Sequence, residues 1–573
     1  MNQSEKNNNP SIHRGWMAAV LVAAALFRLL IMLKSQYAIS FDEAHYLRMA
    51  GQFRLDGIPG LLHPYWSPFY PFVVSVFSFV FGDMELTARI VNILMGVLLI
   101  PAIARLTASF FGPKTALVSA ACLAFYPNLA FQATGAMPET LYTVMGILGI
   151  LAAWKAFTQN SWISGLAAGL LWAGNYLIKP EGIGYLMVCI VVGILWIIFN
   201  GTVKRWKRMP VLPALLAGFF ILAVPYLMYL HAGTGKWTLS TKGEVNQQLS
   251  AAVLFENEGI KDPFYHLTED NMHLPYDMAY HIGNLNELNR IQEGNERIVH
   301  IPIQNYIKKY VRNVYLMLRF AIPRLFTAPL LVLWAIGFFG PIYQRKQWAK
   351  IGYLASFVLF FWFVVIPVFH VNDRYLAPMF PLMFIWIGNG CLILYRWLEE
   401  NLKRFLPEGN RIHFRPKRTA LIVLMAGLAV FSFLPELAKV VSVSRDSNDM
   451  WSQPVELRKA GFWLKSQTSE PPVIMSLNKA VDFYAGQYDM KKGASFSYDS
   501  IERNLAYAIH RKVDFMVFSE RYISWFPNLK PLIDNRNLPD GLQRVYNETG
   551  PSGLRTVIYR IVPSSFPNGR VLD

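Results

Sequence analysis

Long apolar stretches separated by short polar segments recur along the chain from Gly15 to Leu434. A helix needs about 20 mostly apolar residues to cross a bilayer, and about eleven stretches approach that length. They are Gly15–Leu33, Leu86–Ala104, Thr115–Phe131, Thr140–Trp154, Trp162–Ile178, Gly182–Phe199, Val211–Leu230, Leu325–Ile342, Ile351–Phe369, Tyr375–Tyr395 and Thr419–Leu434. The pattern predicts an all-α polytopic membrane protein with about eleven transmembrane helices.

The residues after Leu434 have the mixed polar and apolar pattern of a soluble domain. Several short runs rich in β-branched and aromatic residues are typical of strands, and others are typical of helices. The strand-like runs are Val473–Ser476, Val513–Ser519, Leu542–Tyr546 and Thr556–Ile561, and the helix-like runs are Val455–Ser466 and Ile501–Arg511. We therefore predict a small α/β domain in this part of the chain.

Composition supports the membrane location, and the distribution of charge adds an orientation. Hydrophobic residues make up 54% of the 573 residues and charged residues 16%, whereas soluble domains carry about 25% charged residues. The net charge is +17, from 54 Lys and Arg against 37 Asp and Glu. Such an excess could indicate nucleic-acid binding, but much of it lies in clusters between apolar stretches, at residues 204–208, 345–350 and 396–418. Clusters of this kind mark cytoplasmic loops, so we expect no nucleic-acid partner.

With these clusters in the cytoplasm, the side of every loop is fixed. The chain divides into a cytoplasmic N-terminus (residues 1–14), a transmembrane domain (15–434) and an extracytoplasmic α/β domain (435–573). Two long external loops, 34–85 and 231–324, lie within the transmembrane domain. The apolar stretch Pro64–Phe81, interrupted by Pro68 and Pro71, would reverse every later loop if it crossed the membrane. We therefore expect it to be an interfacial or re-entrant helix in the first external loop.

Ionisable residues near the ends of the predicted spans gather on the outer side. They are Asp42, Glu43, His63, Glu139, Lys179, Glu181, His370, Asp373 and Arg374. Charged groups at membrane depth are costly and usually face a polar cavity, so their convergence predicts one outward-facing site.

Each group also has a structural interpretation that the sequence leaves open. Asp42 and Glu43 could cap a helix. Glu139 could begin a helix after Pro138, residues 179–181 could form only a polar turn, and Arg374 could hold a helix at the membrane interface.

No motif for another chemistry competes with this site. The sequence contains no Gly-x-x-x-x-Gly-Lys-Ser/Thr loop, which would bind phosphates, and no His-Glu-x-x-His, which would bind zinc. It also contains no Gly-x-Ser-x-Gly, which would present a nucleophilic serine, and no Asp-x-Asp, which commonly holds the metal ion of a nucleotide sugar. An outward-facing site also has no access to cytoplasmic ATP or nucleotide sugars. An activated donor would have to arrive within the membrane, most simply as a lipid phosphate.

Residues 40–46, Ser-Phe-Asp-Glu-Ala-His-Tyr, resemble the Asp-Glu-x-x-Tyr sequence in the first external loop of GT-C glycosyltransferases. The relevant branch holds the protein O-mannosyltransferases and the bacterial aminoarabinose transferases of lipid A. Further segments resemble family motifs in the same order: Gly-Ile-Pro to Tyr-Pro at 57–71, Ala-Arg-Ile at 88–90, Met-Pro-Glu-Thr-Leu at 137–141, Lys-Pro-Glu-Gly at 179–182 and Asp-Arg-Tyr-Leu-Ala-Pro at 373–378. Lys179 stands where the family more often has Arg, and Tyr65 where it has a second Pro.

This resemblance, which covers most of residues 15–398, implies a GT-C enzyme of the bacterial inner membrane. It would move a hexosyl or pentosyl group from a polyprenyl-phosphate donor to a lipid or protein acceptor at the periplasmic face, in cell-envelope glycosylation such as lipopolysaccharide modification. By the same resemblance, Asp42 is the general base that takes the acceptor proton, with Glu43 beside it to position the acceptor. One base opposite the leaving group gives inversion.

The remaining candidates would bind substrate: Tyr46, His63, Glu139, Lys179, Glu181, His370 and Arg374. Arg374, Lys179 and His63 would act as fixed cations for the departing phosphate. Glu139 would hold a sugar hydroxyl or, together with Asp42, a divalent cation; no cofactor or obligatory metal is expected. Two other classes stay open, a transporter or flippase of lipid-linked sugars, although no internal repeat is visible, and an O-antigen polymerase or ligase with pyrophosphate-linked donors.

Overall fold

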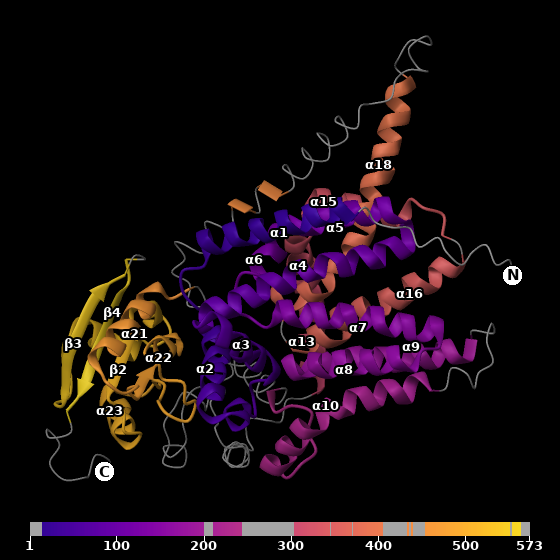
Figure 1. The fold of residues 1–573 in the computed structure, drawn as a ribbon. Helices are drawn as coiled ribbons and strands as arrows, with labels where there is room; N and C mark the ends of the chain where they lie inside the picture. The colour runs from indigo at the N-terminus through magenta and orange to yellow at the C-terminus, as the bar shows by residue number, and fades with distance from the viewer. Residues whose placement is uncertain are drawn as a thin grey trace.

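The computed structural model describes residues 14–199, 210–242, 303–343, 345–369, 371–404, 433–434, 437–438, 453–550 and 553–562. It consists of a helical bundle and a C-terminal domain that contains a small sheet (Figure 1). The α-helices of the bundle are α1 (Arg14–Ser35), α2 (Phe41–Asp56), α3 (Phe69–Phe81), α4 (Met84–Phe111), α5 (Pro113–Ala124), α6 (Pro127–Gln132), α7 (Glu139–Gln159), α8 (Trp162–Ile178), α9 (Ile183–Phe199), α10 (Val211–Thr234), α13 (Ile303–Leu316), α14 (Ile322–Leu325), α15 (Ala328–Phe339), α16 (Arg345–Leu359), α17 (Asp373–Leu376) and α18 (Phe384–Arg404).

All the predicted apolar stretches except the last coincide with helices of the bundle. Within the described ranges, 7 helices are long and apolar enough to cross a membrane, or up to 8 if the bent pair Ile303–Leu325 and Ala328–Phe339 forms one span. The helices α5 and α8 are apolar but shorter, and Pro127 separates α5 from α6 within the predicted span 115–131. Most of Thr419–Leu434 lies outside the described residues. The multi-pass helical fold is confirmed, and the number eleven stays a prediction.

The first external loop folds into helices that lie across the end of the bundle. Between α1 and α4 the chain forms α2, the short 3-10 helix Ile58–Leu61, and α3. In Figure 1, α2 and α3 run across the ends of α7 and α8, between the bundle and the C-terminal domain. The helix α3 has 13 residues, about 20 Å at 1.5 Å per residue, which is short for a membrane span. This agrees with the prediction of an interfacial helix.

Small residues and one buried arginine hold neighbouring helices together. A Cβ on Gly169 in α8 would collide with the backbone of Leu215 in α10, which is the close approach that small residues allow in membrane bundles. Arg28 in α1 is buried, and its Nη1 donates to the carbonyl oxygen of Ala124 in α5 at 2.9 Å. A Cβ on Gly96 in α4 would lie 3.0 Å from Arg28 Nε. Gly96 therefore leaves room for the arginine between the helices.

The C-terminal domain is a four-stranded mixed sheet with helices packed against it. Its elements are α21 (Val455–Gln467), β1 (Ile474–Ser476), α22 (Ala480–Tyr484), α23 (Ile501–His510), β2 (Phe515–Ser519), α24 (Lys530–Asp534), β3 (Leu542–Thr549) and β4 (Arg555–Ile561). The strand order is β1-β2-β4-β3; β1 and β2 are parallel, and β4 runs antiparallel to both β2 and β3. The predicted α/β domain is confirmed, because every predicted strand and helix has its counterpart.

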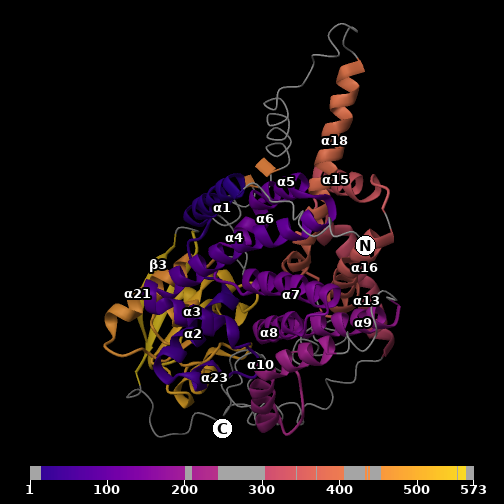
Figure 2. The same ribbon diagram turned by 45° about the vertical axis from the view of Figure 1, so that its right-hand side comes forward.

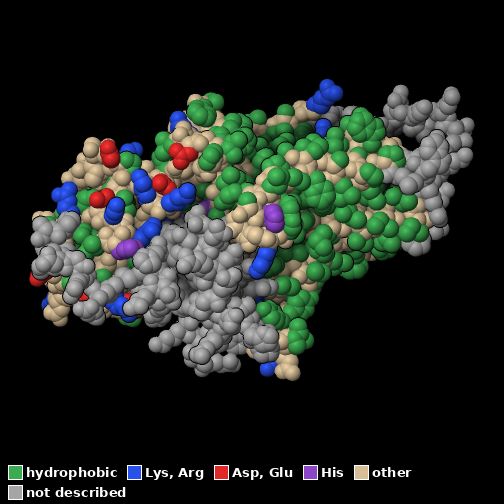
Figure 3. Space-filling view, turned by 90° about the horizontal axis from the view of Figure 1, so that it is seen from below, with side chains coloured by type: hydrophobic (Ala, Val, Ile, Leu, Met, Phe, Trp, Pro, Cys, Tyr) green, Lys and Arg blue, Asp and Glu red, His purple; other side chains and the backbone are tan. Residues whose placement is uncertain are grey.

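The two parts of the molecule have different surfaces. On the face drawn in Figure 3, hydrophobic side chains predominate over the bundle, whereas Lys, Arg, Asp and Glu side chains gather over the C-terminal domain. Figure 2 shows the same domain beside α2 and α3 from a second direction. An apolar belt is what a bilayer requires of the helices that cross it, so the end of the bundle next to the domain lies at one membrane interface.

Candidate active site

Four of the predicted residues meet in one network of ion pairs beside the C-terminal domain. The guanidinium of Arg374 joins two carboxylates: its Nη2 lies 2.8 Å from Asp42 Oδ2, and its Nε lies 2.8 Å from Glu139 Oε1. The ammonium of Lys179 lies 3.1 Å from the same oxygen of Glu139. Residues that are far apart in the sequence are thus brought to one point, as the charge pattern predicted.

Each of these side chains sits at a helix terminus for a local reason. The helix α7 begins at Glu139 directly after Pro138, which occupies the N-cap position. The helix α8 ends before Lys179, whose extended backbone suits the residue that precedes a proline, here Pro180. The side chain of Asn372 caps α17 by accepting a hydrogen bond from the backbone N–H of Arg374 at 3.0 Å.

The network is buried at one end and open at the other. The side chains of Glu139 and Lys179 are 2% and 4% exposed, whereas those of Asp42 and Arg374 are 28% and 31% exposed. A buried carboxylate is stable only when it is paired, and Glu139 has two cations. Asp42 and Arg374 form its more exposed end, which is called the mouth of the site below.

Glu181 and aromatic rings complete the surroundings of Lys179. Glu181 Oε1 lies 3.5 Å from Lys179 Nζ, and the ring of Tyr375 faces this ammonium at 4.9 Å and the Arg374 guanidinium at 5.3 Å. Burial opposes the charged form of Lys179, but Glu139 and Glu181 outweigh it and raise the pKa of Lys179 above its ordinary value. The two carboxylates thus favour the charged form of Lys179 in this site.

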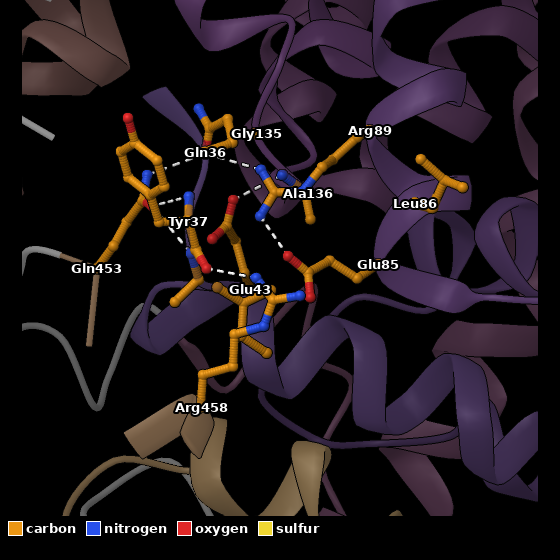
Figure 4. Close-up of polar contacts among 12 residues, drawn as sticks. Gln36, Tyr37, Glu43, Glu85, Leu86, Arg89, Gly135, Ala136, Gln453 and Arg458 are labelled. Carbon is orange, nitrogen blue, oxygen red and sulfur yellow. Dashed lines mark hydrogen bonds and ion pairs between the residues drawn. The ribbon is translucent and has the colours of Figure 1, made fainter. Parts of the chain in front are cut away.

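Glu43 lies next to Asp42 in sequence but has different contacts. Its Oε1 accepts a hydrogen bond from the backbone N–H of Ala136 at 2.6 Å, and its Oε2 accepts one from Ser40 at 2.5 Å. Figure 4 shows Glu43 beside Ala136. The bond to Ser40 is that of a capping-box glutamate, and the bond to Ala136 adds a contact with a second loop. The helix-cap interpretation therefore applies to Glu43, and the carboxylate at the mouth of the site belongs to Asp42.

Tyr46 lies in α2, and His63 lies in the loop that follows it. The ring of Tyr46 packs edge-on against Trp66 at 5.1 Å. Burial, reinforced by the charges of Glu139 and Asp42, raises the pKa of Tyr46 well above its ordinary value, so the phenol keeps its proton. His63 Nδ1 accepts hydrogen bonds from the backbone N–H groups that follow it, those of Tyr65 at 3.0 Å and Trp66 at 3.1 Å.

Through these two hydrogen bonds the ring of His63 organises the loop that follows it. The role of His63 as a cation for the phosphate stays a prediction. His370 lies outside the described residues, and its role stays a prediction.

Lys242 is a residue that the sequence did not single out. Its ammonium faces the rings of Tyr65 at 4.9 Å and Trp66 at 5.1 Å. Burial lowers the pKa of Lys242; the charges of Lys179 and Arg374 add to this shift, and those of Glu181 and Asp42 oppose it. Lys242 is therefore held against the aromatic rings of the loop that follows α2 and is electrostatically coupled to the residues of the network. Its position just after an apolar stretch on the predicted outer side was the available signal, but it lies in a loop without a motif.

The network gives no direct support to a metal site. Asp42 and Glu139 are both paired with Arg374, so a protein cation occupies the position between them. Among the residues that the structure describes, no group of three or more His, Cys, Asp or Glu side chains could hold a metal ion. Whether the reaction needs a divalent cation stays a prediction.

Solved structures with a similar fold include an oligosaccharyltransferase and ArnT. The apo oligosaccharyltransferase of Archaeoglobus fulgidus superposes with a TM-score of 0.55 at 12% identity, over 89% of this chain and 70% of that chain. ArnT from Cupriavidus metallidurans, solved in the apo state and bound to undecaprenyl phosphate, superposes with a TM-score of 0.53 at 14% identity, over 97% of this chain and 100% of that chain. At such identities the likeness establishes the fold alone.

The chain is therefore a multi-pass membrane protein with the GT-C glycosyltransferase fold, which confirms the resemblance carried by its motifs. Residues 63–229 match the family model described as dolichyl-phosphate-mannose-protein mannosyltransferase. That match includes Glu139, Lys179 and Glu181. A search of curated proteins finds no match to the sequence.

Proposed function

We propose that the protein is an inverting glycosyltransferase of the bacterial inner membrane. It takes a sugar from a polyprenyl-phosphate donor and transfers it, at the periplasmic face, to a hydroxyl of a lipid or protein acceptor. The observation that carries the proposal is the pairing of Asp42 and Arg374 at the mouth of a buried network with Glu139 and Lys179. One site thereby holds a base for the acceptor and fixed cations for a phosphate.

The reaction needs a base and a stabilised leaving group. The acceptor oxygen attacks the anomeric carbon while the bond between that carbon and the phosphate oxygen breaks, and its electron pair stays on the phosphate. Asp42 takes the hydroxyl proton, a role worth about 10²–10⁴-fold in rate. Arg374 and Lys179 stabilise the charge that grows on the phosphate. Because the attack comes from the side opposite the leaving group, the configuration inverts.

We assign roles to the remaining groups from their ion pairs. Arg374 is held by Asp42 and Glu139 in the absence of substrate, so an arriving phosphate competes with these carboxylates for the guanidinium. Transfer of Arg374 from Asp42 to the phosphate frees the Asp42 carboxylate to accept a proton. Glu139 stays charged beside Lys179 and orients a hydroxyl of the sugar. Lys242, in its aromatic surroundings, adds a further cation for the phosphate.

The relatives support the class of donor. ArnT from Cupriavidus metallidurans has been solved with undecaprenyl phosphate, and the oligosaccharyltransferase AglB of Archaeoglobus fulgidus with a dolichol-phosphate and an inhibitory peptide. Both ligands are phosphates of long polyprenyl chains. A site with several cations at the membrane interface matches that chemistry, whereas the identity of the sugar and of the acceptor is left to experiment.

The test is transfer by purified protein in lipid nanodiscs, with radiolabelled polyprenyl-phosphate sugars and a crude envelope extract as acceptor. Release of polyprenyl phosphate together with labelled product is expected from the wild type. Asp42→Asn should lower the rate by about 10²-fold or more without weakening donor binding, because the proton moves only during the reaction and a neutral amide competes less with the phosphate for Arg374. Asp56→Asn, at the other end of α2, is the matched control and should transfer normally. Movement of intact donor across the membrane without product would favour the flippase, and a strict need for pyrophosphate-linked donors would favour the polymerase.

A further inference from the structure

The segment of residues 36–40 between α1 and α2 leads directly into Asp42. It forms neither helix nor strand, and Ala38 and Ile39 within it are fully buried. Buried backbone N–H and C=O groups must find partners. A segment without regular structure has to obtain them from side chains or from other parts of the chain.

Most of these partners come from the C-terminal domain. Gln453 Oε1 accepts hydrogen bonds from the backbone N–H groups of Tyr37 at 2.6 Å and Ala38 at 3.0 Å. Its Nε2 donates to the carbonyl oxygen of Ser35 at 3.0 Å, and Arg458 Nη1 donates to that of Tyr37 at 2.5 Å. Figure 4 shows Gln453 and Arg458 on either side of Tyr37.

Tyr484 completes this set of contacts. Its hydroxyl accepts a hydrogen bond from the backbone N–H of Ile39 at 2.9 Å and donates one to Glu85 Oε2 at 2.9 Å. The next amide, that of Ser40, is bound by Glu43. The backbone amides from Tyr37 to Ser40 therefore all have acceptors, and those before Ser40 depend on side chains of the C-terminal domain.

The domain also contacts α2 itself. Arg48 is fully buried, and its guanidinium donates to the backbone carbonyl oxygens of Gln487 at 2.9 Å and Asp489 at 2.7 Å. Its Nη1 lies 3.9 Å from the buried carboxylate of Asp482. The helix that carries Asp42 is thus attached to the domain both before and after that residue.

We infer that the C-terminal domain positions the catalytic base: Gln453, Tyr484 and Arg48 fix the segment 36–40 and α2, and thereby the place of the Asp42 carboxylate. The inference rests on the proposed role of Asp42. A base must lie within hydrogen-bond reach of the acceptor, and displacement by about 1 Å can cost about 10²-fold in rate. Gln453, Tyr484 and Arg48 are positioning residues: Gln453 and Tyr484 contact the chain before Asp42, and Arg48 attaches α2 to the domain.

Two substitutions in the full-length protein test this role. Tyr484→Phe removes only the hydroxyl that Ile39 and Glu85 use, and Gln453→Met keeps a long unbranched side chain without hydrogen bonds. Tyr546→Phe is the matched control, because its hydroxyl bonds to Glu548 within the same domain at 3.0 Å. We expect faster amide hydrogen exchange across residues 36–40 and a kcat lowered by about 10-fold or more, with little change in the KM for donor. The control should change neither.

A double substitution separates positioning from other effects. Combined with Asp42→Asn, Tyr484→Phe should lower the remaining rate no further, because groups that act as a unit are not additive. The inference is overturned by unchanged hydrogen exchange, by faster exchange with a normal kcat, or by the same loss of rate in the Asp42→Asn background. Wild-type transfer by Asp42→Asn alone would instead refute the base itself and with it the proposed mechanism. Gln453→Met gives the same readouts if Tyr484→Phe does not fold.

Discussion

Replacement of Arg374 by lysine is the sharpest test of the ion network. Arg374 contacts Asp42 and Glu139 through different nitrogens of one planar group, each at 2.8 Å. A lysine keeps the charge but presents a single point donor on a flexible chain, so it cannot hold both carboxylates in the same geometry. The substitution therefore changes the arrangement of the charge and leaves its sign unchanged.

The expected loss follows from one charge-assisted hydrogen bond. Such a bond contributes about 1.5–3 kcal/mol, which is about 10- to 100-fold in rate. Because the Arg374 side chain is 31% exposed, we expect Arg374→Lys to lie at the lower end, near 10-fold in kcat/KM. Arg374→Ala removes a fixed cation entirely and should cost about 10²–10³-fold in kcat.

The assay is sugar transfer by purified, monodisperse variants in nanodiscs, with donor binding measured separately. Arg324→Lys is the matched control, since Arg324 pairs with Asp373 at 3.6 Å and its side chain is 62% exposed; exposed pairs contribute about 0–1 kcal/mol. We expect this control to transfer at the wild-type rate. Near-normal transfer by Arg374→Ala would remove Arg374 from the mechanism, and equal losses in both lysine variants would refute the argument from geometry.

Three further predictions follow from the same contacts. Glu43→Gln should lower the thermal stability by about 1–3 kcal/mol, because one of its two backbone donors loses its acceptor, while the folded variant keeps most of its transfer activity; a normal melting temperature would contradict this. Lys242→Arg should extend donor binding to higher pH: the wild-type ammonium loses its proton as pH rises through its lowered pKa, whereas arginine stays charged, and identical pH profiles would exclude Lys242 from donor binding. In a variant without native cysteines, Lys236→Cys and Lys491→Cys should react with an impermeant thiol reagent in intact cells, and Lys114→Cys should not; the reverse pattern would invert the topology.

The sequence was sufficient to predict that the site residues converge, because two independent rules applied. Basic clusters fix the side of each loop, and a helix that crosses the membrane carries the next loop to the other side. Asp42, Glu139, Lys179 and Arg374 were therefore assigned to one side without any knowledge of the packing. The strands of the C-terminal domain were predictable for a similar reason, since their apolar runs are short and bounded by polar turns.

Contacts between distant segments were not predictable from these rules. Glu43 binds the backbone of Ala136, 93 residues away, and no local pattern encodes a side chain that bonds to another loop's backbone. The same holds for Gln453, whose polar side chain would ordinarily be assigned to the surface. The sequence did not indicate Lys242 as a site residue, because its contact with Tyr65 depends on the tertiary fold of its loop. Local sequence indicates where helices end and on which side of the membrane a loop lies. Tertiary packing decides which residues come into contact in one site.

The buried Arg28 has a consequence for the order in which the protein is made. Its guanidinium reaches the carbonyl oxygen of Ala124, 96 residues further along the chain. When α1 leaves the ribosome, that partner has not yet been synthesised, and only the carbonyl oxygen of Ala24, one turn away in α1, is within reach. An arginine near the middle of a lone membrane helix is costly. The guanidinium of Arg28 therefore gains its interhelical acceptor only after α5 has been made, and until then α1 carries a charge whose bonding is incomplete.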